Sequence, residues 1–139
     1  MSRRPLIAGN WKMYLSMDEA VQLASSIASS CRGIDDRDVM LAPPSIFLQA
    51  VSESVQGSPV IVAGQNVCWE SEGAFTGEIS PVMLKAAGAG MVILGHSERR
   101  HIFQESDELV NKRLLGALRF DLIPILCICL LYTSDAADE

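Results

Sequence analysis

The chain has 139 residues, of which 49% are hydrophobic and 20% are charged, and its formal net charge is -6. This length and composition are typical of one globular domain, or part of one, with a single ordinary core. The mildly acidic balance argues against a nucleic-acid-binding protein and against a polybasic membrane-surface protein, so neither nucleic acid nor a membrane is expected among its partners.

Five short apolar runs recur along the chain. Each run is continuous instead of alternating with polar residues, which is typical of strands covered on both faces of a parallel sheet. The runs therefore predict five buried strands. They start at Pro5, Val39, Val60, Met91 and Leu122.

Apolar residues at helical spacing fill the segments between these runs. The first helix is expected to start at Met17, because Ser16 and Glu19 form a capping box, and Gly33 offers a stop. A second helix is expected over residues 45–54.

Two more helices are expected further along the chain. The third begins at Pro81, with Ser80 as its cap and proline at the first helical position, where a missing N–H costs nothing. The fourth spans residues 106–120. Its inward-facing residues are expected to be Val110, Leu114, Ala117 and Leu118.

The alternation of strands and helices predicts an α/β fold with a parallel sheet and right-handed crossovers. Two architectures fit: an open doubly wound sheet, or the first part of a (β/α)8 barrel. The sequence GAG at residues 88–90 ends a helix instead of opening one, so its context excludes a dinucleotide fingerprint, and no Walker-type phosphate loop is present.

Polar residues follow several of the predicted strands. In a barrel, the carboxyl ends of the strands carry the chemistry. The residues are Asn10 and Lys12 after the first strand, Gln65 and Asn66 after the third, and His96 and Glu98 after the fourth. Their shared position favours a barrel with a site at this end.

The segment over residues 65–78 is long for a connection between a strand and a helix. It is expected to expose Val67, Trp69 and Phe75. A lid, or an arm that docks into a partner, would explain its length and its apolar residues. The alternative is a loop that folds over its own barrel.

The cysteines and the N-terminus bear on the cellular compartment. Four cysteines at irregular spacing fit neither a disulfide framework nor a zinc site, and favour a reducing, cytoplasmic setting. The two arginines at residues 3–4 resemble a twin-arginine signal, but polar residues follow too soon, so no export is expected. The apolar run at 122–132 is too short for a membrane-spanning helix.

Three motifs carry a resemblance to a known family. AGNWKM at residues 8–13, QNVCWESEGAFTGEIS at 65–80 and ILGHSERR at 93–100 are similar to triosephosphate isomerase, in that order and at that family's spacing. The resemblance covers residues 5–128. It implies a (β/α)8 TIM barrel, of which residues 1–128 would form about the first four βα units and the fifth strand.

The resemblance also implies an activity. The family interconverts dihydroxyacetone phosphate and glyceraldehyde 3-phosphate through an enediol, as a homodimer, without a cofactor or a metal. Moving a proton between adjacent carbons places negative charge on a carbonyl oxygen, so the site needs hydrogen-bond donors and a cation. By resemblance, His96 and Lys12 are catalytic, and Asn10 and Lys12 bind substrate. Taken singly, each has a structural explanation as a core histidine, a solvated lysine or a turn residue.

The sequence SERR after His96 can open a short helix. Its free N–H groups would face the imidazole and favour the neutral ring. The family is itself the established example of a neutral imidazole that polarises a carbonyl, so the resemblance carries this point. Ser97 and Glu98 resemble residues that support the catalytic groups, with Glu98 near Lys12. The alternative for Glu98 is a solvent-facing pair with a neighbouring arginine.

The resemblance assigns a second role to the segment over residues 65–78, which inserts into the partner subunit in the family. Gln65, Asn66, Phe75 and Thr76 are therefore expected at a dimer interface. Thr76 near the tip would approach Asn10 and Lys12 of the other subunit, which would make dimerisation a condition of activity.

The resemblance ends after residue 128. Where the family has Gly and then Glu, this chain has Cys129 and Leu130, and residues 129–139 are expected to be an artefactual tail foreign to the fold. The glutamate base, the closing lid and the later phosphate loops have no counterpart, so the chain is expected to be inactive as it stands. The alternative function is a catalytically dead fragment that binds a full-length isomerase subunit through residues 65–78. A different phosphate-binding barrel is the least favoured alternative.

Overall fold

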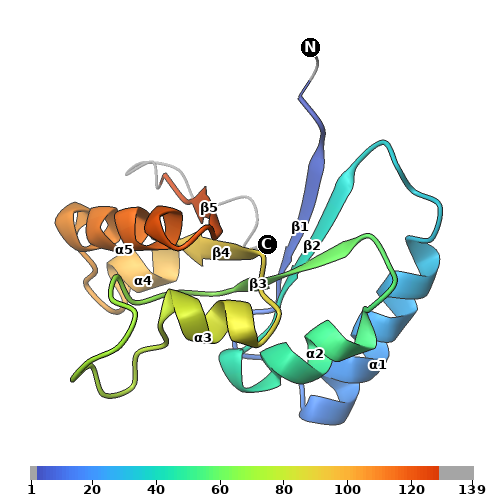
Figure 1. The fold of residues 1–139 in the computed structure, drawn as a ribbon, viewed down its shortest axis with the longest axis horizontal. Coiled ribbons are helices and arrows are strands. Elements are labelled where there is room, and N and C mark those ends of the chain that lie inside the picture. Colours follow the sequence, from blue (N-terminus) through green and yellow to red (C-terminus); the bar gives the residue numbers. More distant parts are fainter. Residues whose placement is uncertain (1–2, 129–139) are drawn as a thin grey trace.

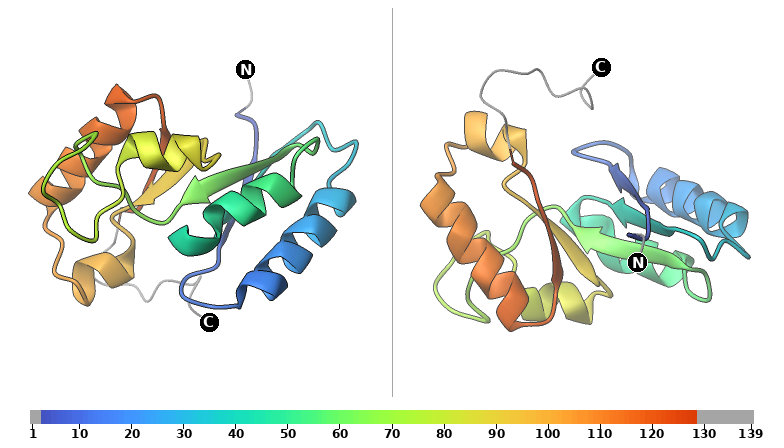
Figure 2. Two further views of the ribbon diagram at one scale, coloured as in Figure 1. Left: turned by 60° about the horizontal axis from the view of Figure 1, so that its bottom comes forward. Right: turned by 90° about the horizontal axis from the view of Figure 1, so that it is seen from above.

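A computed structural model of the chain describes residues 3–128 as five parallel strands and the helices that connect them (Figure 1). The helices lie along the outer side of a curled sheet (Figure 2). The elements are β1 (Leu6–Asn10), α1 (Met17–Ser30), β2 (Asp38–Ala42), the 3-10 turn η1 (Ser45–Phe47), α2 (Leu48–Ser54), β3 (Val60–Gly64), α3 (Pro81–Ala86), β4 (Met91–Leu94), α4 (Ser97–His101), α5 (Asp107–Arg119) and β5 (Ile123–Leu126).

The order of the strands decides between the two predicted architectures. Every strand pairs in parallel with its neighbours in the chain, in the order β1-β2-β3-β4-β5. A doubly wound sheet would reverse its strand order at a switch point, whereas a barrel adds each strand beside the last. The curled, sequential sheet confirms the partial (β/α)8 barrel.

The pairing between strands is uneven. β1 and β2 pair over their whole length, from Leu6 with Asp38 to Asn10 with Ala42. β3 and β4 share two register pairs, Ala63 with Met91 and Gly64 with Val92. We call this short junction between β3 and β4 the seam.

The predicted helix caps are confirmed. The Ser16 side chain accepts a hydrogen bond from the Glu19 amide, and the Glu19 carboxylate accepts one from the Ser16 amide, so the capping box closes in both directions. Ser80 caps α3 with Pro81 at its first position, as predicted. Ser106, the first residue of the fourth predicted helix, is the cap of α5. The second helix differs slightly from the prediction, because a 3-10 turn precedes α2.

The inward face of α5 was predicted partly wrongly. Val110 and Ala117 are buried and Leu114 packs against the core, but Leu118 is 53% exposed. Arg113 takes an inward position instead and is 3% exposed. The spacing of apolar residues does not predict this arrangement. A charged residue such as Arg113 is normally assigned to the solvent face of a helix.

The sheet separates two apolar clusters. Along β2, Met40 and Ala42 face the inside of the curl, while Leu41 faces the helices. The helix-side cluster is larger and includes residues from α1, α2, α3 and α5. The prediction that all strands are covered on both faces is wrong for β1 and β5, since Ile7 is 56% and Ile123 58% exposed.

The proposed tail at residues 129–139 lies outside the described residues. Within residues 3–128, no helix is long and apolar enough to cross a bilayer.

Candidate active site

A cavity of about 230 Å³ opens at the carboxyl ends of the strands. It brings together the six polar residues that the sequence placed after β1, β3 and β4. The cavity is lined by Asn10, Lys12, Met13, Ser45, Gln65, Asn66, His96, Glu98, Arg99 and Phe103. Three further candidates, Ser97, Phe75 and Thr76, do not line it.

Lys12 reaches the cavity from a strained loop after β1. Its φ is 52°, in the left-handed region that costs a non-glycine residue about 1 kcal/mol. The Asn10 side-chain oxygen accepts a hydrogen bond from the Lys12 amide at 3.0 Å. The Gln65 amide nitrogen donates to the Lys12 carbonyl at 2.8 Å and to the Ala42 carbonyl at 2.9 Å. These bonds fix the loop against β2 and β3.

His96 stands between β4 and the short helix α4. Gly95 precedes it with φ 64°, and a side chain there would meet Arg100 at 2.8 Å and Val110 at 2.9 Å, so glycine is required at this turn. His96 is the N-terminal cap of α4, as the sequence SERR predicted. Its Nδ1 accepts a hydrogen bond from the Glu98 amide at 3.4 Å.

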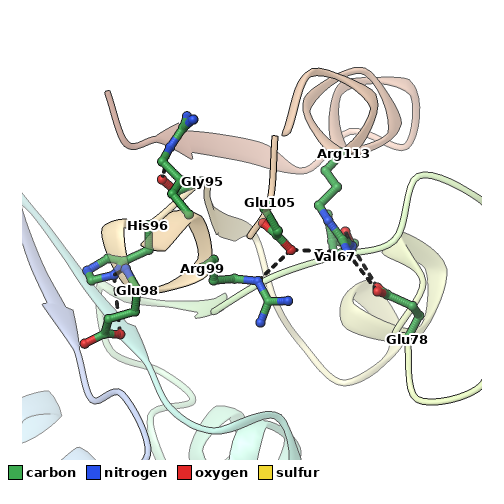
Figure 3. Close-up of polar contacts among 9 residues, drawn as sticks. Val67, Glu78, Gly95, His96, Glu98, Arg99, Glu105 and Arg113 are labelled. Carbon is green, nitrogen blue, oxygen red and sulfur yellow. Dashed lines mark hydrogen bonds and ion pairs between the residues drawn. The ribbon is translucent and has the colours of Figure 1, made fainter. Parts of the chain in front are cut away.

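Glu98 links the two sides of the cavity. Its Oε1 lies 2.9 Å from Lys12 Nζ. Its Oε2 lies 3.4 Å from His96 Nδ1 (Figure 3). The alternative of a surface pair with an arginine is not what is found. Arg99 bonds to Glu105 at 2.7 Å, and Arg100 bonds to Asp107 at 2.5 Å. We call Lys12, His96 and Glu98 the cavity cluster.

The long segment over residues 65–78, called the arm below, has a buried base and an exposed tip. The expectation that Val67 is exposed is wrong, because Val67 is 1% exposed. Trp69 is half-buried and meets the Phe75 ring edge-on at 5.4 Å. Phe75 and Thr76 lie in the exposed tip. The base therefore folds over its own barrel while the tip extends from it (Figure 2).

A second charge cluster lies under the arm. It was not predicted from the sequence. Arg113 of α5 holds the Glu78 carboxylate through two bonds, at 2.7 and 2.8 Å, and lies 3.3 Å from Glu105 (Figure 3). The hydrogen bonds from the Arg113 guanidinium lower the pKa of Glu78. Arg113 is a charged residue on an apolar helical stripe, a position that signals a buried partner. We call Arg113, Glu78 and Glu105 the buried cluster.

A second cavity of about 190 Å³ adjoins the first. Ser45, Asn66 and Arg99 line both. The Asn66 side-chain oxygen is buried and has no hydrogen-bond partner in the described part of the chain. Arg99 and Phe103 carry no sequence signal beyond their closeness to His96 and Glu98, and Ser45 follows β2 at the same edge of the sheet. Across residues 3–128, no three His, Cys, Asp or Glu side chains are grouped to hold a metal ion.

The family profile of triosephosphate isomerase matches residues 5–137. The chain belongs to the triosephosphate isomerase family. The triosephosphate isomerase of Roseiflexus castenholzii is 50% identical over 126 residues, and that of Caldanaerobacter subterraneus subsp. tengcongensis is 47% identical over 126 residues.

Both alignments cover 91% of this chain and 50% of the relative, so the chain spans about half the length of these triosephosphate isomerases. Among solved structures, the triosephosphate isomerase from Bartonella henselae superposes with a TM-score of 0.80 at 36% identity. That superposition covers 91% of this chain and 52% of the other. The fold and the family are therefore established together.

Proposed function

We propose that this chain carries the amino-terminal half of a triosephosphate isomerase site. The substrates are dihydroxyacetone phosphate and glyceraldehyde 3-phosphate, and the reaction moves a proton through an enediol in glycolysis. One observation supports this most strongly: Asn10 and Lys12 at the end of β1 and His96 after β4 line one cavity. Each can donate a hydrogen bond to the oxygen on which negative charge develops.

The bonds behind the donors support their assigned roles. The Asn10 oxygen is occupied by the Lys12 amide, which leaves the Asn10 amide nitrogen for a ligand. The Lys12 ammonium supplies the positive charge for the phosphate and the developing oxyanion, and Glu98 holds it at 2.9 Å. Glu98 is thus a positioning residue that acts through Lys12, and the resemblance gives the neighbouring Ser97 a supporting role as well.

His96 acts in this proposal as a neutral imidazole. Its Nδ1 can accept from the Glu98 amide only when that nitrogen carries no proton, which leaves Nε2–H as the donor to the substrate. The contact of Nδ1 with the Glu98 carboxylate would instead need a proton on Nδ1. We favour the amide bond, because the first turn of α4 presents its N–H groups to the ring and Glu98 is engaged by Lys12.

The proton-abstracting base is absent from this assignment. Glu98 is bound to Lys12 and belongs to a different position of the family's motif, so no carboxylate of residues 3–128 is assigned as the base. We therefore propose that the 139-residue chain alone has essentially no turnover, because donors without a base and phosphate loops do not complete the reaction. The working form is a homodimer in the cytoplasm, with Gln65, Asn66, Phe75 and Thr76 at or near the interface.

A chimera tests the donor set. Residues 5–126 of this chain replace the matching half of the Roseiflexus castenholzii enzyme, and isomerase activity is measured in a coupled assay. We expect an active chimera in which His96→Gln and Lys12→Met each lower kcat/KM by about 100-fold or more. His101→Gln on the exposed end of α4 is the matched control and is expected to keep full activity.

Two results would contradict the proposal. A chimera whose activity is unaffected by His96→Gln removes His96 from catalysis. Turnover by the 139-residue chain alone, abolished by His96→Gln, overturns the proposed inactivity of the fragment.

A second function rests on the exposed tip of the arm. The chain would bind a full-length isomerase subunit through residues 65–78 and inactivate it. Adding the chain to the intact Roseiflexus castenholzii enzyme is expected to lower its activity in proportion to the fragment added. Unchanged activity at a large molar excess of fragment would exclude this function.

A further inference from the structure

The two ends of the arm are held by one side chain. Arg113 Nη1 donates to the Val67 carbonyl at 2.6 Å where the arm begins, and the guanidinium holds the Glu78 carboxylate where it ends. The backbone closes the same neck, because the Cys68 amide donates to the Ile79 carbonyl at 2.8 Å. The ten or so residues between these points form a closed loop on a fixed base.

α5 also provides a seat for the arm. Trp69 lies under two cations of this helix, with Arg113 at 5.6 Å and Lys112 at 5.8 Å from the ring. Gly116, one turn further along, faces the Trp69 backbone. A β-carbon at Gly116 would meet Trp69 Cα at 2.5 Å and its carbonyl oxygen at 2.9 Å, so the close approach needs glycine.

Two contacts connect the base of the arm, at Trp69 and Glu78, to Phe75 in its exposed tip. Trp69 contacts Phe75 edge-on, and the Glu78 amide donates to the Phe75 carbonyl at 2.9 Å. The exposed residues 72–77 therefore begin and end on groups that α5 positions. Arg113 itself is buried and lies outside any surface that a partner could touch.

We propose that Arg113 is a positioning residue that holds the arm in its docking conformation before a partner subunit is met. The partner on which the arm docks is a second subunit of this family, so the inference rests on the proposed function. A loop that is already ordered loses less conformational entropy when it docks, and association is correspondingly tighter. Assembly thus depends on a residue of α5 that makes no contact with the partner.

Hydrogen–deuterium exchange of the 139-residue chain tests the positioning step. Arg113→Lys keeps the charge and the helix but loses the two-pronged hold on Glu78. The amides of residues 69–77 are expected to exchange about tenfold faster, the size that follows from losing a charge-assisted hydrogen bond. Arg119→Lys, at an exposed position of the same helix, is the control and is expected to leave the arm unchanged.

Association with labelled Roseiflexus castenholzii subunits tests the docking step. Arg113→Lys is expected to weaken binding about tenfold relative to the unsubstituted chain and to Arg119→Lys. Equal binding by a variant with a loosened arm would overturn the positioning role. If the unsubstituted chain does not bind at all, the docking function fails, and the exchange measurement still decides whether Arg113 orders the arm.

The exchange result has its own contrary outcomes. If exchange of the arm is unchanged in Arg113→Lys, the backbone bond between Cys68 and Ile79 is sufficient to order the arm, and the positioning role of Arg113 is overturned. Faster exchange spread equally over β2, β3 and the arm shows a general stabilising role and overturns specific positioning.

Discussion

The cavity cluster and the buried cluster contain similar ion pairs in opposite surroundings. Lys12 and Glu98 lie 2.9 Å apart in an open cavity, and Lys12 sits on a strained backbone. Arg113 and Glu78 lie 2.7 Å apart beneath the arm, and Arg113 sits on a regular helix. Ion-pair distance alone therefore does not show what a pair does. Access for a ligand and the cost of desolvation separate a binding site from a structural joint.

Replacing the cation of the buried cluster with methionine is expected to have the largest effect on the free energy of unfolding. Arg113→Met removes both bonds to Glu78 and leaves the buried Glu105 with Arg99 as its only cation among the residues described, so the free energy of unfolding should fall by about 3 kcal/mol. Urea unfolding followed by circular dichroism measures it. A loss as small as that of Arg119→Met would show that the buried cluster is not a structural joint.

The next largest expected effect is a loss of stability in the buried cluster at low pH. The pKa of Glu78 is lowered from 4.5 by Arg113, so its contribution to stability is complete above pH 4.5 and is lost as the pH falls through the lowered value. Glu78→Gln removes this dependence. The stability gap between the unsubstituted chain and Glu78→Gln should narrow as the pH falls below 4.5. A gap that stays constant from pH 7 to pH 3 contradicts the linkage.

The smallest expected change is in the cavity cluster. Lys12→Met removes a partly exposed pair, so the free energy of unfolding should change by less than about 1 kcal/mol. The same urea titration used for Arg113→Met makes the comparison direct. A loss of the size expected for Arg113→Met would mean that the cavity cluster supports the fold as much as the buried one.

Much of the fold was predictable, because local signals determine it. The caps at Ser16 and Ser80 depend on neighbouring residues and occur as predicted. Strand order was not decided by periodicity, since a doubly wound sheet uses the same alternation. The burial of Arg113 depends on its contacts with Val67 and Glu78 in the distant arm, which no local period encodes.

The candidate site was predictable to a similar degree. Its polar residues follow strand ends, and parallel strands bring their carboxyl ends to one edge. Gln65 was assigned to a dimer interface by resemblance, and its bonds to the Lys12 and Ala42 carbonyls lie within this chain. Such bonds join segments far apart in sequence, and only coordinates reveal them.

The short pairing at the seam has a mechanical consequence. β3 and β4 share two register pairs where β1 and β2 share five, so a chain pulled from its ends should part first between β3 and β4. Lys12 lies on one side of this line, and His96 and Glu98 lie on the other. The 2.9 Å contact between Lys12 and Glu98 bridges it. The distance between residues 12 and 98 therefore reports whether β1–β3 and β4–β5 remain paired. Spectroscopic labels at these two positions would measure that distance.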